Sequence, residues 1–263
     1  MSNPKEDNHL TTKEFWAKQH KNISLPQTIR PEERYVFFLL DELFKKHLPK
    51  NDKFTFLEIG CSPGAWMIYF HKTFGYNVTG IEYTTQGYEL TKQNLKCTNT
   101  PGNVIHEDVF STTLQPESFD VVVSFGFIEH FEDQQEIIDV HYRLLKKGGI
   151  LIIGVPNIFE DAVYGVVQRC ISPREYKELR AAHAHIDVET LNVQIEKHPI
   201  KRLMCDYAGV VNFSVVNTAA RGRWVQLAYS IFASTIARWA KRLSIRRETK
   251  QFSPYVFYIG KKE

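Results

Sequence analysis

The sequence predicts an α/β fold in which a mainly parallel sheet carries helices on both faces. Between positions 54 and 155, short apolar runs alternate with helical stretches of about 10–15 residues, which is the order of repeated βαβ units. The run Ile150–Val155 is almost entirely Ile, Leu and Val, as expected for a strand buried on both faces. A third observation is a strand that ends in Gly60 and leads directly into a helical stretch.

From 13 to 48 the apolar residues recur at helical spacing and Pro49 ends the pattern, so an N-terminal helical cap is expected. Period-two and apolar runs bounded by glycine predict strands, and amphipathic runs between them predict helices. In this central part we expect strands at 54–59, 78–81, 103–106, 120–125 and 150–155, and helices at 65–74, 86–96 and 133–145.

After Pro156 the pattern is weaker. Here we expect a helix at 188–197, a strand at 212–216, a long helix at 224–243 and a last strand at 255–259, which pairs antiparallel. The expected division is a cap at 1–50, a ligand-binding core at 51–157, and a substrate-side lid, basic helix and final strands at 158–263. All three belong to one domain.

Composition narrows the class of protein. Of 263 residues 43% are hydrophobic and 24% charged, and 33 Lys+Arg against 30 Asp+Glu give a net charge of +3, which argues against a disordered or fibrous chain. The four cysteines lack metal-ligand spacing, so neither a zinc finger nor a disulfide framework is expected. The longest uncharged apolar stretch, 224–237, is shorter than the ~20 residues that cross a bilayer. We therefore expect a cytoplasmic protein.

The turn after the first strand is the most informative segment. Gly60 and Gly64 permit a tight turn and close backbone approach, and the helix that follows points free N–H groups at a ligand. Dinucleotide-binding turns carry glycine where this chain has Glu58, and a carboxylate there repels a pyrophosphate. Pro63 also removes one donor. A cationic ligand with an amine and a ribose suits this turn better.

Acidic residues follow the next two strands. Glu82 closes the second strand, where a carboxylate can accept hydrogen bonds from both hydroxyls of a ribose. Asp108 follows the third strand and can accept from the exocyclic amine of a base, although the adjacent Glu107 is an alternative partner. Gly126 follows the fourth strand. The carboxyl ends of parallel strands share one edge of a sheet, so these residues are expected to form one site.

In this order the motifs resemble those of class I S-adenosylmethionine-dependent methyltransferases. The matching segments are Glu58-x-Gly60-x-x-x-Gly64, Glu82, Asp108, 119–124 and 144–149. The resemblance implies a Rossmann-like, doubly wound, seven-stranded sheet with an antiparallel last strand, and S-adenosylmethionine as cofactor. It also implies cofactor contacts from Glu58, Gly60, Cys61, Ser62, Pro63, Gly64, Glu82, Tyr83, Asp108, Val109, Ser124, Phe125 and Gly126.

Two shorter segments, Ile128–Phe131 and Val155–Asn157, are similar to bacterial small-molecule O-methyltransferases. This similarity implies methyl transfer to a hydroxyl of a sugar, polysaccharide precursor or lipid-linked metabolite, with an amine as the other acceptor. Two other functions stay open. One is a binding protein that keeps the cofactor site without turnover, and the other is an NAD-type oxidoreductase, which Glu58 disfavours.

His130 is the predicted catalytic residue. An imidazole there could take the proton of an acceptor hydroxyl, and the alternative is a histidine that only packs beside the next helix. Glu129 and His130 are also metal-binding residue types, but the sequence offers no evident third ligand, so no metal is expected. His183 and His185 are expected to lie in a polar surface segment.

The segment 221–247 is basic and rich in large apolar residues. It contains seven positive residues and no acidic one, next to Trp224 and Trp239. This pattern is typical of a helix that lies on anionic lipid at the inner face of the membrane, and equally of a helix buried on one side. A homodimer contact is a further alternative. Nucleic acid is not expected as a partner, because the rest of the chain is acidic.

Overall fold

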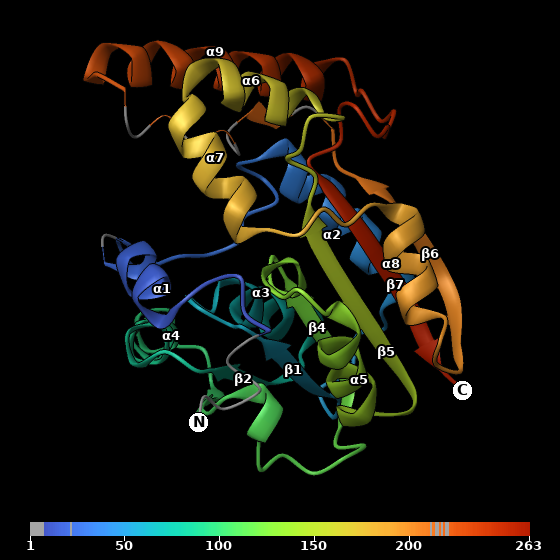
Figure 1. Ribbon diagram of the computed structural model, residues 1–263. Coiled ribbons are helices and arrows are strands. Elements are labelled where there is room, and N and C mark those ends of the chain that lie inside the picture. Colours follow the sequence, from blue (N-terminus) through green and yellow to red (C-terminus); the bar gives the residue numbers. More distant parts are fainter. Residues whose placement is uncertain (1–7, 22, 211, 214–215, 217, 219–220) are drawn as a thin grey trace.

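The computed structural model describes residues 8–21, 23–210, 212–213, 216, 218 and 221–263. Its centre is a seven-stranded sheet in the order β3-β2-β1-β4-β5-β7-β6 (Figure 1). The strands from β1 to β5 are parallel, and β7 pairs antiparallel with both β5 and β6. The fold class predicted from the sequence is therefore confirmed. The strands are β1 (Thr55–Ile59), β2 (Asn77–Glu82), β3 (Gly102–His106), β4 (Phe119–Phe125), β5 (Leu145–Pro156), β6 (Ile200–Ala208) and β7 (Tyr255–Lys262).

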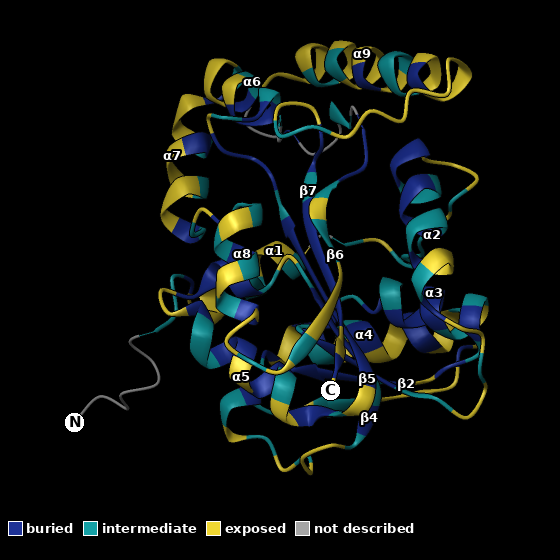
Figure 2. Cartoon of the chain, turned by 90° about the vertical axis from the view of Figure 1, so that its right-hand side faces the viewer, coloured by how far each residue is buried: buried dark blue, intermediate teal, exposed yellow. Residues whose placement is uncertain are grey.

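Each face of the sheet carries its own apolar core, because successive side chains of a strand point to opposite faces. In β4, Val121 and Val123 belong to one core and Val122 to the other. The first core includes residues of α2 (Tyr35–His47), α3 (Ala65–Phe74) and α4 (Thr85–Cys97), and the second includes residues of α5 (Gln134–Leu144) and α8 (Val188–Ile195). Figure 2 shows the central strands as the most buried part of the chain. This doubly wound arrangement leaves the carboxyl ends of the parallel strands free to form a site.

The N-terminal part differs from the single helical region expected at 13–48. It contains two separate helices, α1 (Lys13–His20) and α2, and α1 packs against α4. Pro26 and Pro31 lie between them and have no backbone N–H to donate, so one continuous helix is not formed. The cap is therefore helical, but it consists of two helices joined by an irregular segment.

The sixth strand also differs from the expectation. The predicted strand at 212–216 includes residues 214 and 215, which lie outside the described residues, and 212, 213 and 216 are not in a strand. The sixth strand is instead β6, an edge strand in which most side chains are polar or partly exposed, so its apolar signal is weak. Helices α6 (Val163–Ile171) and α7 (Pro173–Ala182) were not expected. β5 begins at Leu145, five residues before the strand predicted at 150–155, so Lys146–Gly149 belong to the strand.

The basic helix is α9 (Arg223–Arg242), close to its predicted bounds, and it lies across one end of the molecule (Figure 1). Only Ala233 and Ala240 are buried among its 20 residues. In the part of the chain that the structure describes, no helix has both the length and the apolar character needed to cross a bilayer.

Candidate functional site

A pocket, called the cavity below, lies at the carboxyl ends of β1, β2 and β3 and beside the segment that follows β4. Residues from four strand ends meet there, as expected for a doubly wound sheet. The N-terminal segment closes the cavity from the other side. Its lining residues are His9, Thr11, Trp16, Ile59, Gly60, Ile81, Tyr83, Glu107, Asp108, Val109, Phe127, His130 and Phe131.

The glycine turn after β1 has the geometry that its sequence predicts. Gly60 has φ +71° and Gly64 has φ +82°, a backbone region that side chains with a Cβ rarely adopt. A Cβ on Gly60 would lie 2.4 Å from Cδ2 of Phe127, and a Cβ on Gly64 would lie 2.8 Å from the methyl group of Thr91. The turn therefore requires glycine at both positions, and Gly60 presents bare backbone to the cavity.

Two carboxylates are buried at this turn and at the end of β2. Glu58 is only 4% exposed, its Oε2 has no hydrogen-bond partner among the described residues, and burial raises the pKa of its carboxyl group well above the usual value. Glu82 is also buried, and its Oε1 accepts hydrogen bonds from the backbone N–H and the hydroxyl of Thr84, at 2.9 Å and 2.6 Å. Two buried carboxyl groups favour a ligand that brings positive charge and hydroxyl donors.

The two acidic residues after β3 have different partners. Both oxygens of Glu107 accept hydrogen bonds from Thr112 or Thr113, including one from the backbone N–H of Thr113 at 2.9 Å. Among the described residues, Oδ1 of Asp108 accepts a hydrogen bond from the backbone N–H of Phe110 at 2.9 Å. This leaves Oδ2 of Asp108 for a ligand in the cavity, so the geometry favours Asp108 over Glu107 as a ligand contact.

Several predicted cofactor residues do not line the cavity with their side chains. The Ser124 hydroxyl is buried and lies 2.9 Å from Nε2 of His141 on α5. Phe125 packs among aromatic side chains such as Trp66 and Phe70, and Cys61 is fully buried. The other predicted residues outside the lining are Glu58, Ser62, Pro63, Gly64, Glu82 and Gly126, all of them at the ends of β1, β2 and β4.

Sequence reasoning missed how the N-terminal segment covers the cavity. His9 stacks on Tyr83 with ring centroids 5.9 Å apart, and its backbone bridges to Phe131. Trp16 meets His130 edge-on at 4.7 Å, which gives the tryptophan a place at the site rather than in the core. Local sequence patterns contain no signal for this placement, because it depends on contacts between residues more than 70 positions apart.

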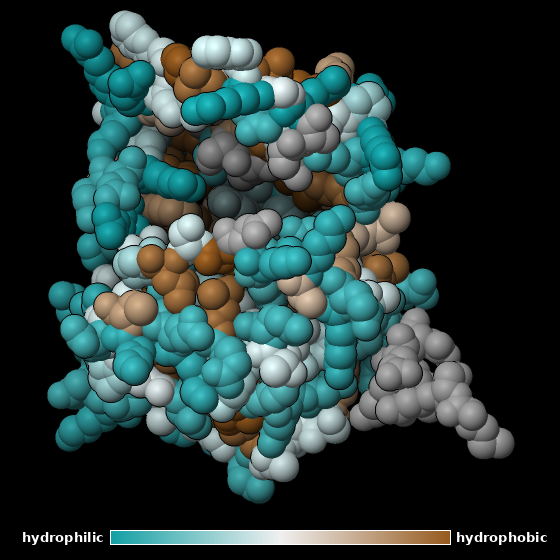
Figure 3. Space-filling view, turned by 90° about the vertical axis from the view of Figure 1, so that its left-hand side faces the viewer, coloured by the Kyte–Doolittle hydropathy of each residue, from teal (hydrophilic) through white to brown (hydrophobic). Residues whose placement is uncertain are grey.

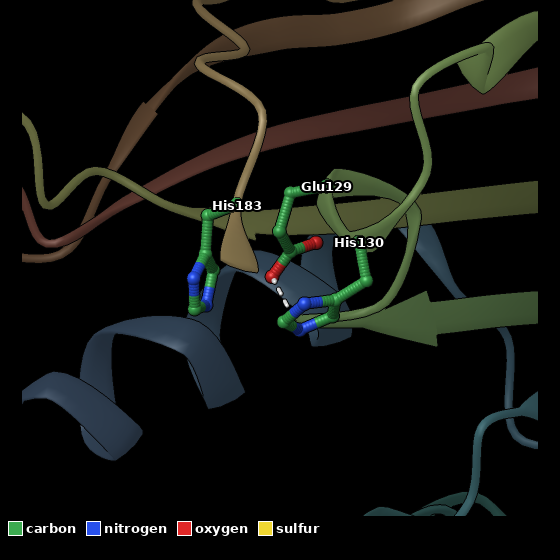
Figure 4. A group of neighbouring side chains, drawn as sticks. All are labelled: Glu129, His130 and His183. Atoms are coloured by element: carbon green, nitrogen blue, oxygen red, sulfur yellow. Dashed lines mark ion pairs between the residues drawn. The ribbon is translucent and has the colours of Figure 1, made fainter. Parts of the chain in front are cut away.

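Beside the cavity, Glu129, His130 and His183 form a cluster whose ligand atoms all lie within 4.8 Å of one another (Figure 4). Glu129 and His130 belong to a short 3₁₀ turn (Ile128–His130) after β4, and His183 follows the end of α7. His183 was expected in a polar surface segment. The structure instead places it against His130, with ring centroids 4.4 Å apart.

Burial controls the protonation of this cluster. It lowers the pKa of His130 to about 3, with a smaller contribution from the neighbouring His183, and it also lowers the pKa of His183. It raises the pKa of Glu129 to about 8. Both imidazoles are therefore neutral near pH 7, and each can offer a lone pair.

S-adenosylmethionine, the cofactor that the sequence resemblance implies, fits the residues present. Its ammonium group suits the buried Glu58 carboxyl group, which lacks a partner at Oε2. Bare backbone at Gly60 would allow the amino-acid part to approach closely, and Glu82 and Asp108 would be the acceptors for the ribose hydroxyls and the adenine amine. A pyrophosphate, by contrast, would meet two buried carboxylates.

Comparison with known proteins agrees with this assignment. Residues 57–153 match the family model described as a methyltransferase domain. A probable S-adenosylmethionine-dependent methyltransferase of Mycolicibacterium smegmatis is 25% identical over 165 residues, which cover 63% of this chain and 62% of the relative. A solved structure of a putative sarcosine dimethylglycine methyltransferase from Galdieria sulphuraria has a TM-score of 0.62 at 10% identity, and the match covers 95% and 98% of the two chains. The [4+2]-cyclase SpnF has a TM-score of 0.63 at 13% identity, covering 96% and 97%.

The matches to curated relatives span between 33% and 62% of the length of those proteins. The two structural likenesses concern the fold alone. The family model covers the segment that contains the glycine turn, Glu82, Asp108 and the Glu129–His130 turn. Residues 57–153 therefore match a methyltransferase domain, and the chain shares the fold of solved S-adenosylmethionine-dependent methyltransferases.

Proposed function

We propose that this protein transfers a methyl group from S-adenosylmethionine to a hydroxyl or amine of a small molecule. The observation that carries the proposal is the cavity in which Gly60, Tyr83 and Asp108 meet His130. Residues suited to hold the cofactor and a residue suited to act on an acceptor thus line the same space. A sugar, a polysaccharide precursor and a lipid-linked metabolite are the acceptor classes that we favour.

In this proposal the chain positions the two reactants and keeps water away from them. The cofactor supplies an activated methyl group and a neutral leaving group. Glu58, Glu82 and Asp108 hold its polar groups, and the glycine turn sets its distance from the sheet. Trp16 and Phe127 narrow the cavity around the reacting atoms. His130 faces the acceptor side, where alignment of acceptor and methyl carbon lowers the barrier.

The test is a pair of binding titrations followed by a product assay. Calorimetry should show binding of S-adenosylhomocysteine and none of NADH, whereas the reverse result would favour the oxidoreductase alternative. Labelled S-adenosylmethionine is then incubated with a panel of sugars, nucleotide-sugars, lipid-linked metabolites and amines. Binding without labelled product from any acceptor would favour the binding-protein alternative.

A matched pair of variants tests which acidic residue after β3 holds the adenine. We expect Asp108→Asn to weaken S-adenosylhomocysteine binding about 5- to 100-fold, because the amide keeps an acceptor for Phe110 but loses the charged acceptor for the adenine amine. Glu107→Gln should leave the affinity nearly unchanged, since its carboxylate is used by Thr112 and Thr113. Isothermal titration of both variants measures the difference, and a larger loss for Glu107→Gln would reverse the assignment.

We also propose that α9 rests on an anionic membrane surface. Large apolar side chains of this helix face outward: its two buried residues are alanines, whereas Trp224 is 81% exposed and Trp239 is 54% exposed. At 100° per residue, the exposed Leu227, Ile231 and Trp224 lie on one stripe. Arg238 and Arg242 lie within or beside this stripe, as in helices that lie at a lipid interface. Figure 3 shows apolar side chains among hydrophilic ones at this end of the molecule.

Vesicle co-sedimentation tests this contact. We expect the protein to pellet with phosphatidylglycerol vesicles at low salt and to be released as salt rises. Each Lys or Arg side chain near the anionic surface contributes about 1 kcal/mol of binding free energy, and salt screens this attraction. The double variant Trp224→Ala/Trp239→Ala should lose most of the pelleting. Val193→Ala on α8 is the control, since Val193 is an exposed apolar residue on another helix. Equal pelleting with neutral phosphatidylcholine vesicles, or none with either, would contradict the contact.

A further inference from the structure

We propose that Glu129, His130 and His183 form a binding site for a divalent transition-metal cation. The three side chains offer two imidazole nitrogens and a carboxylate, the ligand set of many catalytic metal sites with open coordination positions. Figure 4 shows the Glu129 carboxylate lying between the two rings. His183 is the third ligand that the sequence alone did not show for the Glu129–His130 pair.

The backbone fixes the tautomer of both histidines in the form that binds a metal. Nδ1 of His130 lies 2.7 Å from the carbonyl oxygen of Ala182, and Nδ1 of His183 lies 2.8 Å from that of Leu179. A carbonyl oxygen only accepts, so each Nδ1 carries the proton and each Nε2 keeps its lone pair. Hydrogen bonding of the second ring nitrogen to a carbonyl is the usual support of a metal-ligating histidine.

The same region of backbone holds His183 in place against the Glu129–His130 turn. The bond from His130 to the Ala182 carbonyl lies on one side of His183 in the chain. On the other side, the Ala184 N–H donates to the Glu129 carbonyl oxygen at 2.6 Å. His183 is therefore held from both neighbouring residues, which positions it without any metal present.

The buried carboxylate of Glu129 is a second argument for a cation at this position. Glu129 is 2% exposed, and neither of its oxygens has a hydrogen-bond partner among the described residues. Buried carboxylates are normally paired, hydrogen-bonded or bound to a metal. Oε1 lies 3.9 Å from Nε2 of His130, and all ligand atoms of the cluster lie within 4.8 Å of one another. Ligand atoms around one ion in a tetrahedral site lie about 3.4 Å apart, so the three side chains would draw together on binding.

The nitrogen and oxygen donors favour Zn²⁺, Co²⁺, Mn²⁺ or Fe²⁺ over Ca²⁺ and Mg²⁺, which prefer oxygen ligands only. Because His130 also lines the cavity, open coordination positions of the ion would face the space where an acceptor binds. There the cation would bind an acceptor oxygen and lower the pKa of its hydroxyl. This role in catalysis rests on the proposed methyl transfer, whereas the binding of the cation does not.

The experiment titrates Co²⁺ and Zn²⁺ into the full chain after treatment with a chelator. We expect one ion per chain, visible as Co²⁺ absorption bands and as a rise in thermal stability. His183→Ala and Glu129→Gln should each weaken the affinity at least about 100-fold. His185→Ala is the matched control: His185 is exposed, is paired with Asp161 at 3.5 Å and lies outside the cluster, so the affinity should not change.

Absence of a one-to-one ion in the wild-type protein would overturn the proposal, as would wild-type affinity in His183→Ala or an equal loss in His185→Ala. If a variant unfolds, the stoichiometry and thermal shift of the wild-type protein still decide. S-adenosylhomocysteine binding is measured on the same metal-free samples. Binding of the ion without binding of S-adenosylhomocysteine would support this metal site and contradict the proposed function. Binding of S-adenosylhomocysteine without binding of the ion would support the proposed function and contradict the metal site.

Discussion

Replacement of Gly60 by valine is expected to abolish S-adenosylhomocysteine binding, with a loss of at least about 100-fold. The Cβ of the branched side chain would lie 2.4 Å from Cδ2 of Phe127, so the Phe127 ring, which lines the cavity, would have to move. The backbone at φ +71° adds strain of about 1–3 kcal/mol for a residue with a Cβ. Calorimetry gives the affinity, and thermal unfolding separates it from the effect on the fold.

Gly148→Val provides the control for that strain. Gly148 also has a positive φ, +74°, but the nearest atom to an added Cβ is Cε of Lys261 at 3.9 Å, and the residue lies at the beginning of β5. Both variants should lose thermal stability, and only Gly60→Val should lose the ligand. Wild-type affinity in Gly60→Val would show that the turn does not contact the cofactor.

The central part of the fold could be predicted because its signals are local. Helix α3 was expected with its observed bounds, since glycines in the left-handed conformation stand at both of its ends. The strands β1, β2 and β4 were found within one or two residues, because buried parallel strands give continuous apolar runs between glycine and polar turns. Here the sequence pattern and the tertiary environment agree.

The errors lie where tertiary contacts decide. β6 is an edge strand with mostly polar outward residues, so its pattern resembles a loop, and pairing with β7 makes it a strand. The strand predicted at 150–155 begins instead at Leu145, which pairs with Phe119 of β4 before a register shift that continues at Ile150. In both places hydrogen bonds to a neighbouring strand overrode a weak local preference.

The site was predictable only in part for the same reason. Gly60 and Asp108, which line the cavity, could be placed there because each comes after a strand and the ends of parallel strands converge. His183 could not, because 53 positions separate it from His130 and its spacing from His185 suggests a surface segment. Its place depends on two hydrogen bonds between the end of α7 and the Glu129–His130 turn, and no local pattern encodes them. The His130 ring donates to the Ala182 carbonyl, and the Ala184 N–H donates to the Glu129 carbonyl.

His130→Ala is expected to lower turnover by about 10²–10⁴ while S-adenosylhomocysteine affinity changes little. His130 lies after β4, beside Glu129 and His183, and the predicted ribose and adenine contacts lie at the ends of β2 and β3. Its removal should therefore affect the acceptor and the methyl transfer more than the cofactor. The measurement compares kcat with the affinity of the folded variant, once the acceptor screen has supplied a substrate.

His141→Ala is the matched control for this last comparison. His141 is also a buried histidine, and its Nδ1 lies 2.7 Å from the backbone carbonyl oxygen of Ile137. Its Nε2, however, lies beside the hydroxyl of Ser124 in β4, and His141 does not line the cavity. An equal loss of turnover in both variants would mean that His130 only supports the fold.

A chelator then distinguishes the two catalytic roles of His130, as a ligand of a cation or as a general base. If His130 binds a cation, chelation lowers the wild-type rate to that of His130→Ala and leaves the variant unchanged, whereas a general base loses nothing to the chelator.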